Sequence, residues 1–226
     1  SSGASFAEKN YGPIVVGKRA HELTSVRAHE NQKAFTIAIP GELTTAALVL
    51  KMIAPDITTI VMPFDQIIDA VLNDEVDTCL LIHEGQLQYE KFGLKKILSL
   101  IDSWNALSQS LNSNTSTLEH LNTSPLPLPL GGNAIKSSLG KNVVHDLSII
   151  VQNSIRYALE HANEARDYAR QFKRDLSEKN VDLYLSWYAN QRTLDMGEEG
   201  RTAIQKLLDL AADRELIPRI GEIEIV

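Results

Sequence analysis

The middle of the chain alternates short apolar runs with amphipathic segments. Runs rich in β-branched residues predict strands over residues 35–41, 57–62 and 76–82. Between these runs, apolar residues at helical spacing predict one helix from Thr44 or Thr45 to Ala54 and a second over 65–72. This order of strands and helices favours an α/β fold with a parallel sheet and helices on its faces.

The segments that flank this unit are less regular. Residues 1–11 are small and polar and predict a loop, whereas residues 12–17 predict a short strand. Residues 18–33 predict a short helix or a turn, and residues 96–105 predict a strand or a short helix. A stretch rich in Ser, Asn and Thr over 108–124 predicts a flexible loop.

Alternating prolines mark residues 125–130, and Gly131-Gly132 follows them. Prolines exclude a helix and a central strand, so the segment is expected to be extended and to cross between domains. A proline-rich ligand motif is the alternative. The rest of the chain is expected to be helical, with a break near Asn163 and a short tail or edge strand over 220–226. The helices are predicted over residues 146–172, 177–190 and 197–216.

Composition narrows the class of protein without identifying it. The 226 residues carry a formal net charge of -7, with 43% apolar and 23% charged residues, as in ordinary globular proteins. The acidic balance argues against nucleic acid or an anionic membrane surface as the main partner. No apolar run approaches the length of a membrane span. The single cysteine, Cys79, excludes an intrachain disulfide and is interpreted as a buried, inert thiol rather than a nucleophile.

Two turns that follow predicted strands carry candidate chemistry. His83 follows the strand over 76–82, and its unperturbed pKa lies near neutrality, so it is a candidate general base. The turn that leads from the strand over 35–41 into the next helix contains Gly41, Thr44 and Thr45. The free N–H groups at the start of that helix could hold a carboxylate or phosphate. Strand ends of a parallel sheet meet at one edge, so both turns should lie together. The structural alternatives are that His83 is an ordinary turn residue and that the Thr44–Thr45 turn is an ordinary N-cap. Glu84 is interpreted as solvated.

The other ionisable residues give weaker signals. No pair of histidines has the spacing of a metal site, so no metal is expected. The aromatic residues near the C-terminal end of the 177–190 helix, Tyr184, Trp187 and Tyr188, are interpreted as core rather than as part of a binding site. Glu198 and Glu199 suit the first turn of a helix.

Five motifs occur along the chain in a specific order: Gly12-Pro13-Ile14-Val15-Val16, Ile39-Pro40-Gly41 with Thr44-Thr45-Ala46, Ile82-His83-Glu84, Leu126-Pro127-Leu128-Pro129-Leu130-Gly131-Gly132-Asn133 and Leu194-Asp195-Met196-Gly197-Glu198-Glu199-Gly200. In this order they resemble 1,4-dihydroxy-6-naphthoate synthase of the futalosine route to menaquinone. The resemblance covers nearly the whole chain, and the Leu-Pro-Leu-Pro-Leu-Gly-Gly segment together with Ile-His-Glu is its most specific part.

The resemblance implies a two-lobed fold like that of type II periplasmic solute-binding proteins. It implies a cytoplasmic, cofactor-free lyase that converts cyclic dehypoxanthine futalosine, a small carboxylate, to 1,4-dihydroxy-6-naphthoate. It makes His83 the general base. It places substrate contacts at Thr44, Thr45, Gly41, Leu130 and Gly131.

The same resemblance divides the chain between two lobes. Residues 1–34 and 126–226 are expected to form the first lobe, and residues 35–125 the second lobe, which carries the site. The first lobe is expected to lack its N-terminal part. A non-catalytic solute-binding protein of the same fold and an inactive fragment remain the alternatives. The sequence leaves the oligomeric state open, with a homodimer as one option.

Overall fold

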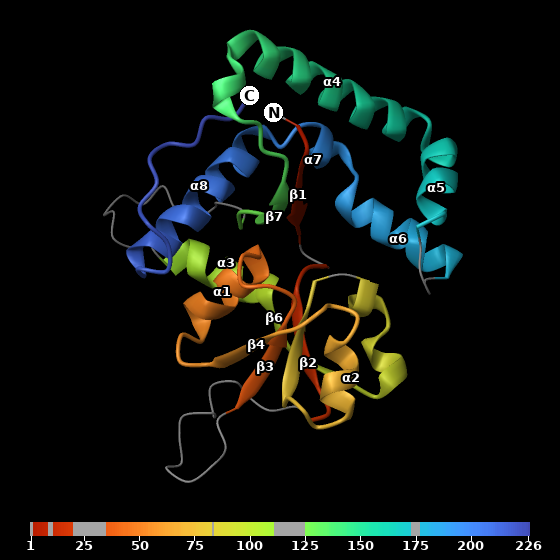
Figure 1. Ribbon diagram of the computed structural model, residues 1–226, viewed down its shortest axis with the longest axis vertical. Helices are drawn as coiled ribbons and strands as arrows, with labels where there is room; N and C mark the ends of the chain where they lie inside the picture. The colour runs from red at the N-terminus through yellow and green to blue at the C-terminus, as the bar shows by residue number, and fades with distance from the viewer. Residues whose placement is uncertain (1, 9–10, 20–34, 83, 111–124, 173–176) are drawn as a thin grey trace.

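The computed structural model describes residues 2–8, 11–19, 35–82, 84–110, 125–172 and 177–226 (Figure 1). Two sheets and eight α-helices lie within these ranges. The candidate base His83 lies outside the described residues, as do most of the 18–33 segment and most of the 108–124 loop. None of the described helices is both long and apolar enough to cross a membrane.

Five strands form the larger sheet in the order β4-β3-β5-β2-β6. They are β2 (Ile14–Gly17), β3 (Thr36–Ile39), β4 (Thr58–Val61), β5 (Thr78–Leu81) and β6 (Lys95–Ser99). The predicted parallel pairing is confirmed for β3 with β4 and with β5. The larger sheet as a whole is mixed, because β2 inserts antiparallel between β5 and β6. Only strands joined by the α1 and α2 crossovers are held parallel, and β2 lies before that unit in the chain.

Helices cover both faces of this sheet. Helices α1 (Thr45–Ile53) and α3 (Leu100–Ser110) pack together with one face, and α2 (Ile67–Leu72) packs on the other. Neighbouring strand residues therefore enter different cores: Ile37 and Ile39 pack with α1, while Ala38 packs with α2. Because both faces of β3 and β5 are buried, these central strands lie in continuous apolar runs of the sequence. The predicted capping of α1 by Thr44 is confirmed.

Cys79 occupies the α2 face of β5 and is 0% exposed. Burial raises the pKa of its thiol to about 12, so the thiol stays protonated at neutral pH. A protonated and inaccessible thiol is a poor nucleophile, which agrees with the interpretation of Cys79 as an inert core residue.

The smaller sheet pairs β1 (Ala4–Ala7) antiparallel with β7 (Leu128–Gly132). The expectation of a loop over residues 1–11 is wrong for β1, because the pairing of this strand with β7 and the packing of Phe6 with Ala203 depend on residues far along the chain. The extended proline segment is confirmed as β7. Pro129 fits there because this strand has only one neighbour and can omit a ladder hydrogen bond.

The remaining helices surround the smaller sheet (Figure 1). Helix α8 packs Ala203 against Phe6 of β1, whereas α4 and α5 contain no buried side chain. The predicted helix break lies at His161 rather than Asn163, and the 220–226 tail forms no strand. The helices are α4 (Lys141–Glu160), α5 (Ala162–Arg170), α6 (Glu178–Tyr188), α7 (Gln191–Leu194) and α8 (Gly197–Asp213).

In Figure 1 the smaller sheet lies above the larger sheet, between it and helix α4. Residues 14–17, which the sequence assigned to the first lobe, are hydrogen-bonded into the larger sheet as β2. The chain passes between the sheets at least twice, from β1 to β2 and from α3 to β7. The lobe boundaries themselves stay a prediction.

Candidate functional site

The ends of three strands meet at the edge of the larger sheet that faces the smaller one. The parallel register pairs Ala38 of β3 with Cys79 of β5. Pro40, which follows β3, and Ile82, which follows β5, line the same cavity. Strand β2 starts at this edge because Ile14 pairs with Leu81. The turns after β3 and β5 therefore share one edge, as the sequence predicted for them.

The Thr44–Thr45 turn is held by hydrogen bonds within the protein. The Thr44 hydroxyl accepts from the amide of Ala47 at 3.1 Å and donates to the carbonyl of Gly41 at 3.0 Å. The Thr45 hydroxyl donates to the carbonyl of Leu130 at 2.8 Å. A hydroxyl has one proton, so neither side chain can also donate to a carboxylate in this arrangement.

The start of α1 nevertheless keeps free amides that could hold an anion. Within the described part of the chain, the amides of Thr45 and Ala46 have no acceptor, because they belong to the first turn of the helix. These amides and the positive end of the helix dipole favour a negative ligand. The two hydroxyls would join such a site only after rotating away from Gly41 and Leu130.

The Thr45–Leu130 hydrogen bond joins α1 to β7 and thus the two sheets. We expect Thr45→Val to lower the free energy of unfolding by about 1 kcal/mol, since the Leu130 carbonyl loses its donor. Thr45→Ser keeps the hydroxyl and should stay close to wild type. Urea unfolding followed by circular dichroism measures both, and equal midpoints for wild type and Thr45→Val would contradict the expectation.

The turn after β5 contacts α6. The described part of this turn consists of Ile82 and the 3-10 helix η2 (Glu84–Leu87). The hydroxyl of Tyr188 donates to the carbonyl of Ile82 at 3.2 Å. The side-chain amide of Gln86 donates to the same hydroxyl at 3.5 Å. His83 lies outside the described residues, so its role as general base stays a prediction.

A cavity of about 260 Å³ opens beside this turn. Its walls are mainly apolar, and two carboxylates, Asp65 and Glu84, lie among them. Glu84 is half-buried, which differs from the solvated position expected from the sequence. The lining residues are Pro40, Phe64, Asp65, Ile67, Ile68, Leu80, Leu81, Ile82, Glu84, Gly85, Gln88 and Phe92. An apolar cavity at strand ends suits a small organic ligand.

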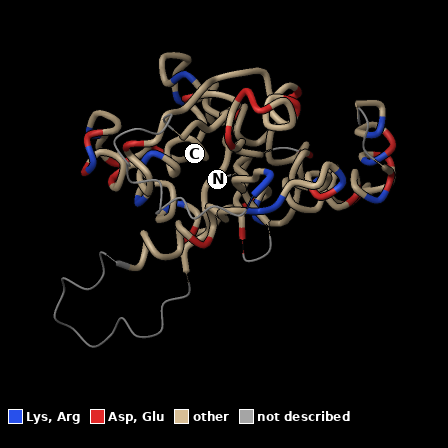
Figure 2. The backbone as a smooth tube through the Cα atoms, turned by 90° about the horizontal axis from the view of Figure 1, so that it is seen from below, with Lys and Arg blue, Asp and Glu red and all other residues tan. Residues whose placement is uncertain are grey.

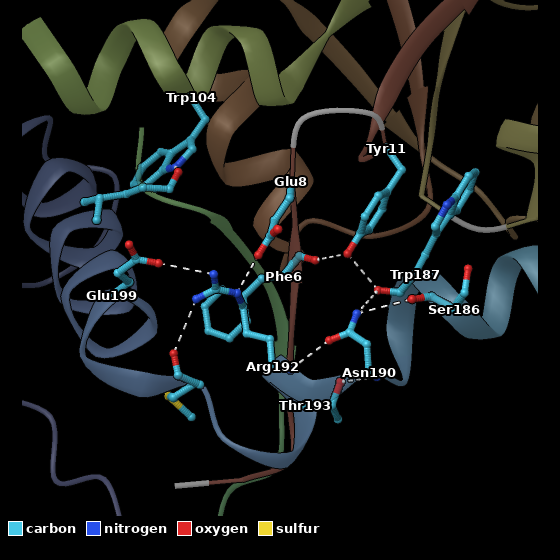
Figure 3. A network of polar contacts seen from close by, with 12 residues as sticks. Phe6, Glu8, Tyr11, Trp104, Ser186, Trp187, Asn190, Arg192, Thr193 and Glu199 are labelled. Atoms are coloured by element: carbon cyan, nitrogen blue, oxygen red, sulfur yellow. Dashed lines mark hydrogen bonds and ion pairs between the residues drawn. The ribbon is translucent and has the colours of Figure 1, made fainter. Parts of the chain in front are cut away.

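A polar network fixes the segment that leads from β1 towards β2 (Figure 3). Arg192 of α7 forms ion pairs with Glu8 and with Glu199 of α8. Tyr11 directs its hydroxyl to the carbonyls of Phe6 at 2.6 Å and Trp187 at 2.8 Å. Burial raises the pKa of Tyr11 to about 12, so its hydroxyl stays protonated. These contacts hold one of the two crossings between the sheets.

The sequence did not identify Tyr188 or Gln86 as parts of this edge. Tyr188 was interpreted as core, and the only signal that could have marked it is the cluster of aromatic residues at the end of α6. Its contact with Ile82 joins residues 106 positions apart, which no local pattern encodes. Of the predicted site residues, the structure brings Thr45 and Leu130 into direct contact and places Gly41 and Thr44 in the same turn.

The described surface offers little support for metal or nucleic-acid binding. Among the residues described, no three His, Cys, Asp or Glu side chains are grouped so that they could hold a metal ion. Acidic and basic residues are interspersed along the backbone (Figure 2). A nucleic-acid surface would require a concentration of basic residues on one face.

Comparison with known sequences gives a consistent match over most of the chain. The sequence profile of a family described as "Menaquinone biosynthesis" matches residues 1–213. A 1,4-dihydroxy-6-naphthoate synthase from Streptomyces coelicolor is 31% identical over 93% of this chain and 68% of its own length. The synthase of the same name from Thermus thermophilus is 30% identical over 92% of this chain and 68% of its own length.

Comparison with solved structures supports the fold. A crystal structure of a protein from Archaeoglobus fulgidus has a TM-score of 0.81 and 37% identity, covering 96% of this chain and 72% of that one. The ligand-binding component of an ABC-type importer from Staphylococcus aureus has a TM-score of 0.55 and 14% identity, covering 96% and 69%. The alkanesulfonate-binding protein from Xanthomonas axonopodis, bound to MOPS, has a TM-score of 0.54 and 13% identity, covering 96% and 70%. The last two likenesses concern the fold alone.

Proposed function

The chain belongs to the menaquinone-biosynthesis family that includes the 1,4-dihydroxy-6-naphthoate synthases, and from this membership we propose that it is a carbon–carbon lyase that forms 1,4-dihydroxy-6-naphthoate. Its α/β fold is that of the periplasmic-binding-protein-like proteins. The proposed substrate is cyclic dehypoxanthine futalosine. The observation that carries the proposal is the identity of 31% and 30% to two synthases over 93% and 92% of this chain.

The proposed chemistry needs a base and an anion site at one edge. His83 is the proposed base: it takes a proton from the sugar part of the substrate, and the resulting negative charge drives cleavage of a carbon–carbon bond, which releases the aromatic 1,4-dihydroxy-6-naphthoate and a fragment of the sugar. Such a reaction requires no cofactor, because the base starts it and the aromatic ring stabilises the product. The parallel pairing of β3 with β5, which brings the turns after these two strands to one edge, supports this assignment.

The substrate carboxylate is proposed to bind at the start of α1. The free amides of Thr45 and Ala46 would hold it, together with the hydroxyls of Thr44 and Thr45 after rotation. Gly41 and the Leu130–Gly131 backbone of β7 complete the proposed contacts. The apolar cavity beside Pro40 and Ile82 could take the ring system of the substrate.

A solute-binding receptor is the second candidate, because the fold is shared with binding components of importers. A receptor needs no general base, so the two functions differ in turnover and not in affinity. The lyase proposal includes a cytoplasmic location for the protein. A homodimer stays a prediction.

One assay decides between these functions. The full chain is incubated with cyclic dehypoxanthine futalosine, binding is followed by isothermal titration calorimetry, and naphthoate is followed by mass spectrometry. Formation of 1,4-dihydroxy-6-naphthoate in proportion to protein concentration supports the lyase. Binding without product supports the receptor. If neither binding nor product is detected, the result supports an inactive fragment.

A further inference from the structure

The last residue of α6 contacts the turn after β5 through two hydrogen bonds. The Tyr188 hydroxyl donates to the carbonyl of Ile82 at 3.2 Å, and Gln86 of η2 donates to that hydroxyl at 3.5 Å. Gln86 is only 9% exposed, so its amide is held inside the contact. One phenol therefore contacts both ends of the turn, at Ile82 and at Gln86.

The end of α6 that carries Tyr188 is itself firmly held. The Tyr188 ring lies 4.6 Å from the ring of Tyr184 and 6.3 Å from that of Tyr11, edge-on to the latter. Tyr11 stacks on Trp187 at 5.1 Å with an interplanar angle of 4°. The Asn190 side chain donates to the carbonyl of Trp187 at 3.1 Å (Figure 3). A donor supported in this way holds its acceptor at a fixed position.

The hydroxyl of Tyr188 keeps its proton throughout the neutral range. Burial raises its pKa, the nearby charge of Glu84 raises it further, and the hydrogen bond from Gln86 acts in the opposite direction. A raised pKa favours the neutral phenol, which is the form that can donate to a carbonyl. The contact with Ile82 is therefore present at the pH at which the proposed reaction would run.

We propose that Tyr188 is a positioning residue for the lyase reaction, acting through the Ile82 carbonyl on the turn after β5. The inference rests on the proposed function, since the proposed base directly follows Ile82 in the sequence. The Ile82 carbonyl belongs to the peptide bond between these two residues, so fixing the carbonyl restrains that peptide bond. A displacement of about 1 Å at a reacting group can cost up to about a hundredfold in rate.

Tyr188→Phe tests this role because it removes the hydroxyl and keeps the ring. We expect kcat for naphthoate formation to fall by about fivefold to about a hundredfold, with KM within about twofold. Tyr184→Phe is the matched control: Tyr184 is one turn away on the same helix, and no hydrogen bond from its hydroxyl occurs within the described residues. This control should keep kcat within about twofold of wild type.

Hydrogen exchange of the peptide covering residues 78–92 provides the second readout. It should exchange faster in Tyr188→Phe than in wild type and Tyr184→Phe. An unchanged kcat, an equal loss in Tyr184→Phe, or a change confined to KM would overturn the positioning role. If wild type forms no naphthoate, the reaction assignment fails together with the kinetic role. The exchange rates then still decide whether Tyr188 holds the turn, and unchanged rates would refute that contact.

Discussion

Replacing His83 with alanine is expected to lower kcat for naphthoate formation by about 10²-fold to about 10⁴-fold, the usual contribution of a general base. The carboxylate contacts proposed at the start of α1 remain in this variant, so KM should stay close to the wild-type value. Steady-state kinetics with cyclic dehypoxanthine futalosine measures both constants. Urea unfolding of the same preparation shows whether the variant is folded.

His145→Ala is the matched control for this experiment. His145 lies on the exposed surface of α4, in the helices around the smaller sheet. Its replacement should leave kcat within about twofold, as expected for an exposed residue away from the site. If His83→Ala turns over at the wild-type rate, His83 is not the base. A loss of rate in both histidine variants would point to a general effect of the substitution.

Trp104→Ala is expected to cause the largest loss of stability, about 3–5 kcal/mol in the free energy of unfolding. Trp104 of α3 is 0% exposed and belongs to the core cluster that also contains residues of α1, α8 and β7. Its indole N–H also donates to the carbonyl of Leu126 at 2.8 Å. Alanine would leave a cavity and an unsatisfied carbonyl in the segment that leads to β7.

Trp104→Phe separates these two effects. Phenylalanine keeps an aromatic ring in the core and removes the donor to Leu126, so a loss of about 1–3 kcal/mol is expected. Urea unfolding followed by tryptophan fluorescence and circular dichroism measures both variants. The prediction is wrong if Trp104→Ala unfolds within 1 kcal/mol of wild type, about the loss of one hydrogen bond.

Much of the larger sheet could be predicted because its signals are local. The helix start at Thr44 and the strands around Ala38 and Cys79 depend on a few adjacent residues. The alternation of strands and helices also predicted that the turns after β3 and β5 lie at the same edge of the larger sheet. The family assignment followed from motifs in their order along the chain, and it supplied the proposed roles that spacing alone left open.

Other features of the site depend on contacts between distant segments. The Thr45 hydroxyl was expected to face a ligand, but it donates to Leu130, which lies 85 positions away. The Tyr188 hydroxyl likewise donates to a distant acceptor, the carbonyl of Ile82, which lies 106 positions away. A side-chain donor bonds to the acceptor that the fold brings within hydrogen-bonding distance. Sequence patterns of a few residues do not contain that information.

The sequence by itself determined the strands and helices between residues 35 and 82, the buried thiol of Cys79 and the family, because periodicity, caps and motifs are short-range features. Only the tertiary structure decided that β1 is a strand, that β2 is antiparallel, and that Tyr188 reaches the turn after β5. The physical reason is that strand pairing and burial depend on partners more than 60 positions away, and their gain in free energy appears only when the chain has folded.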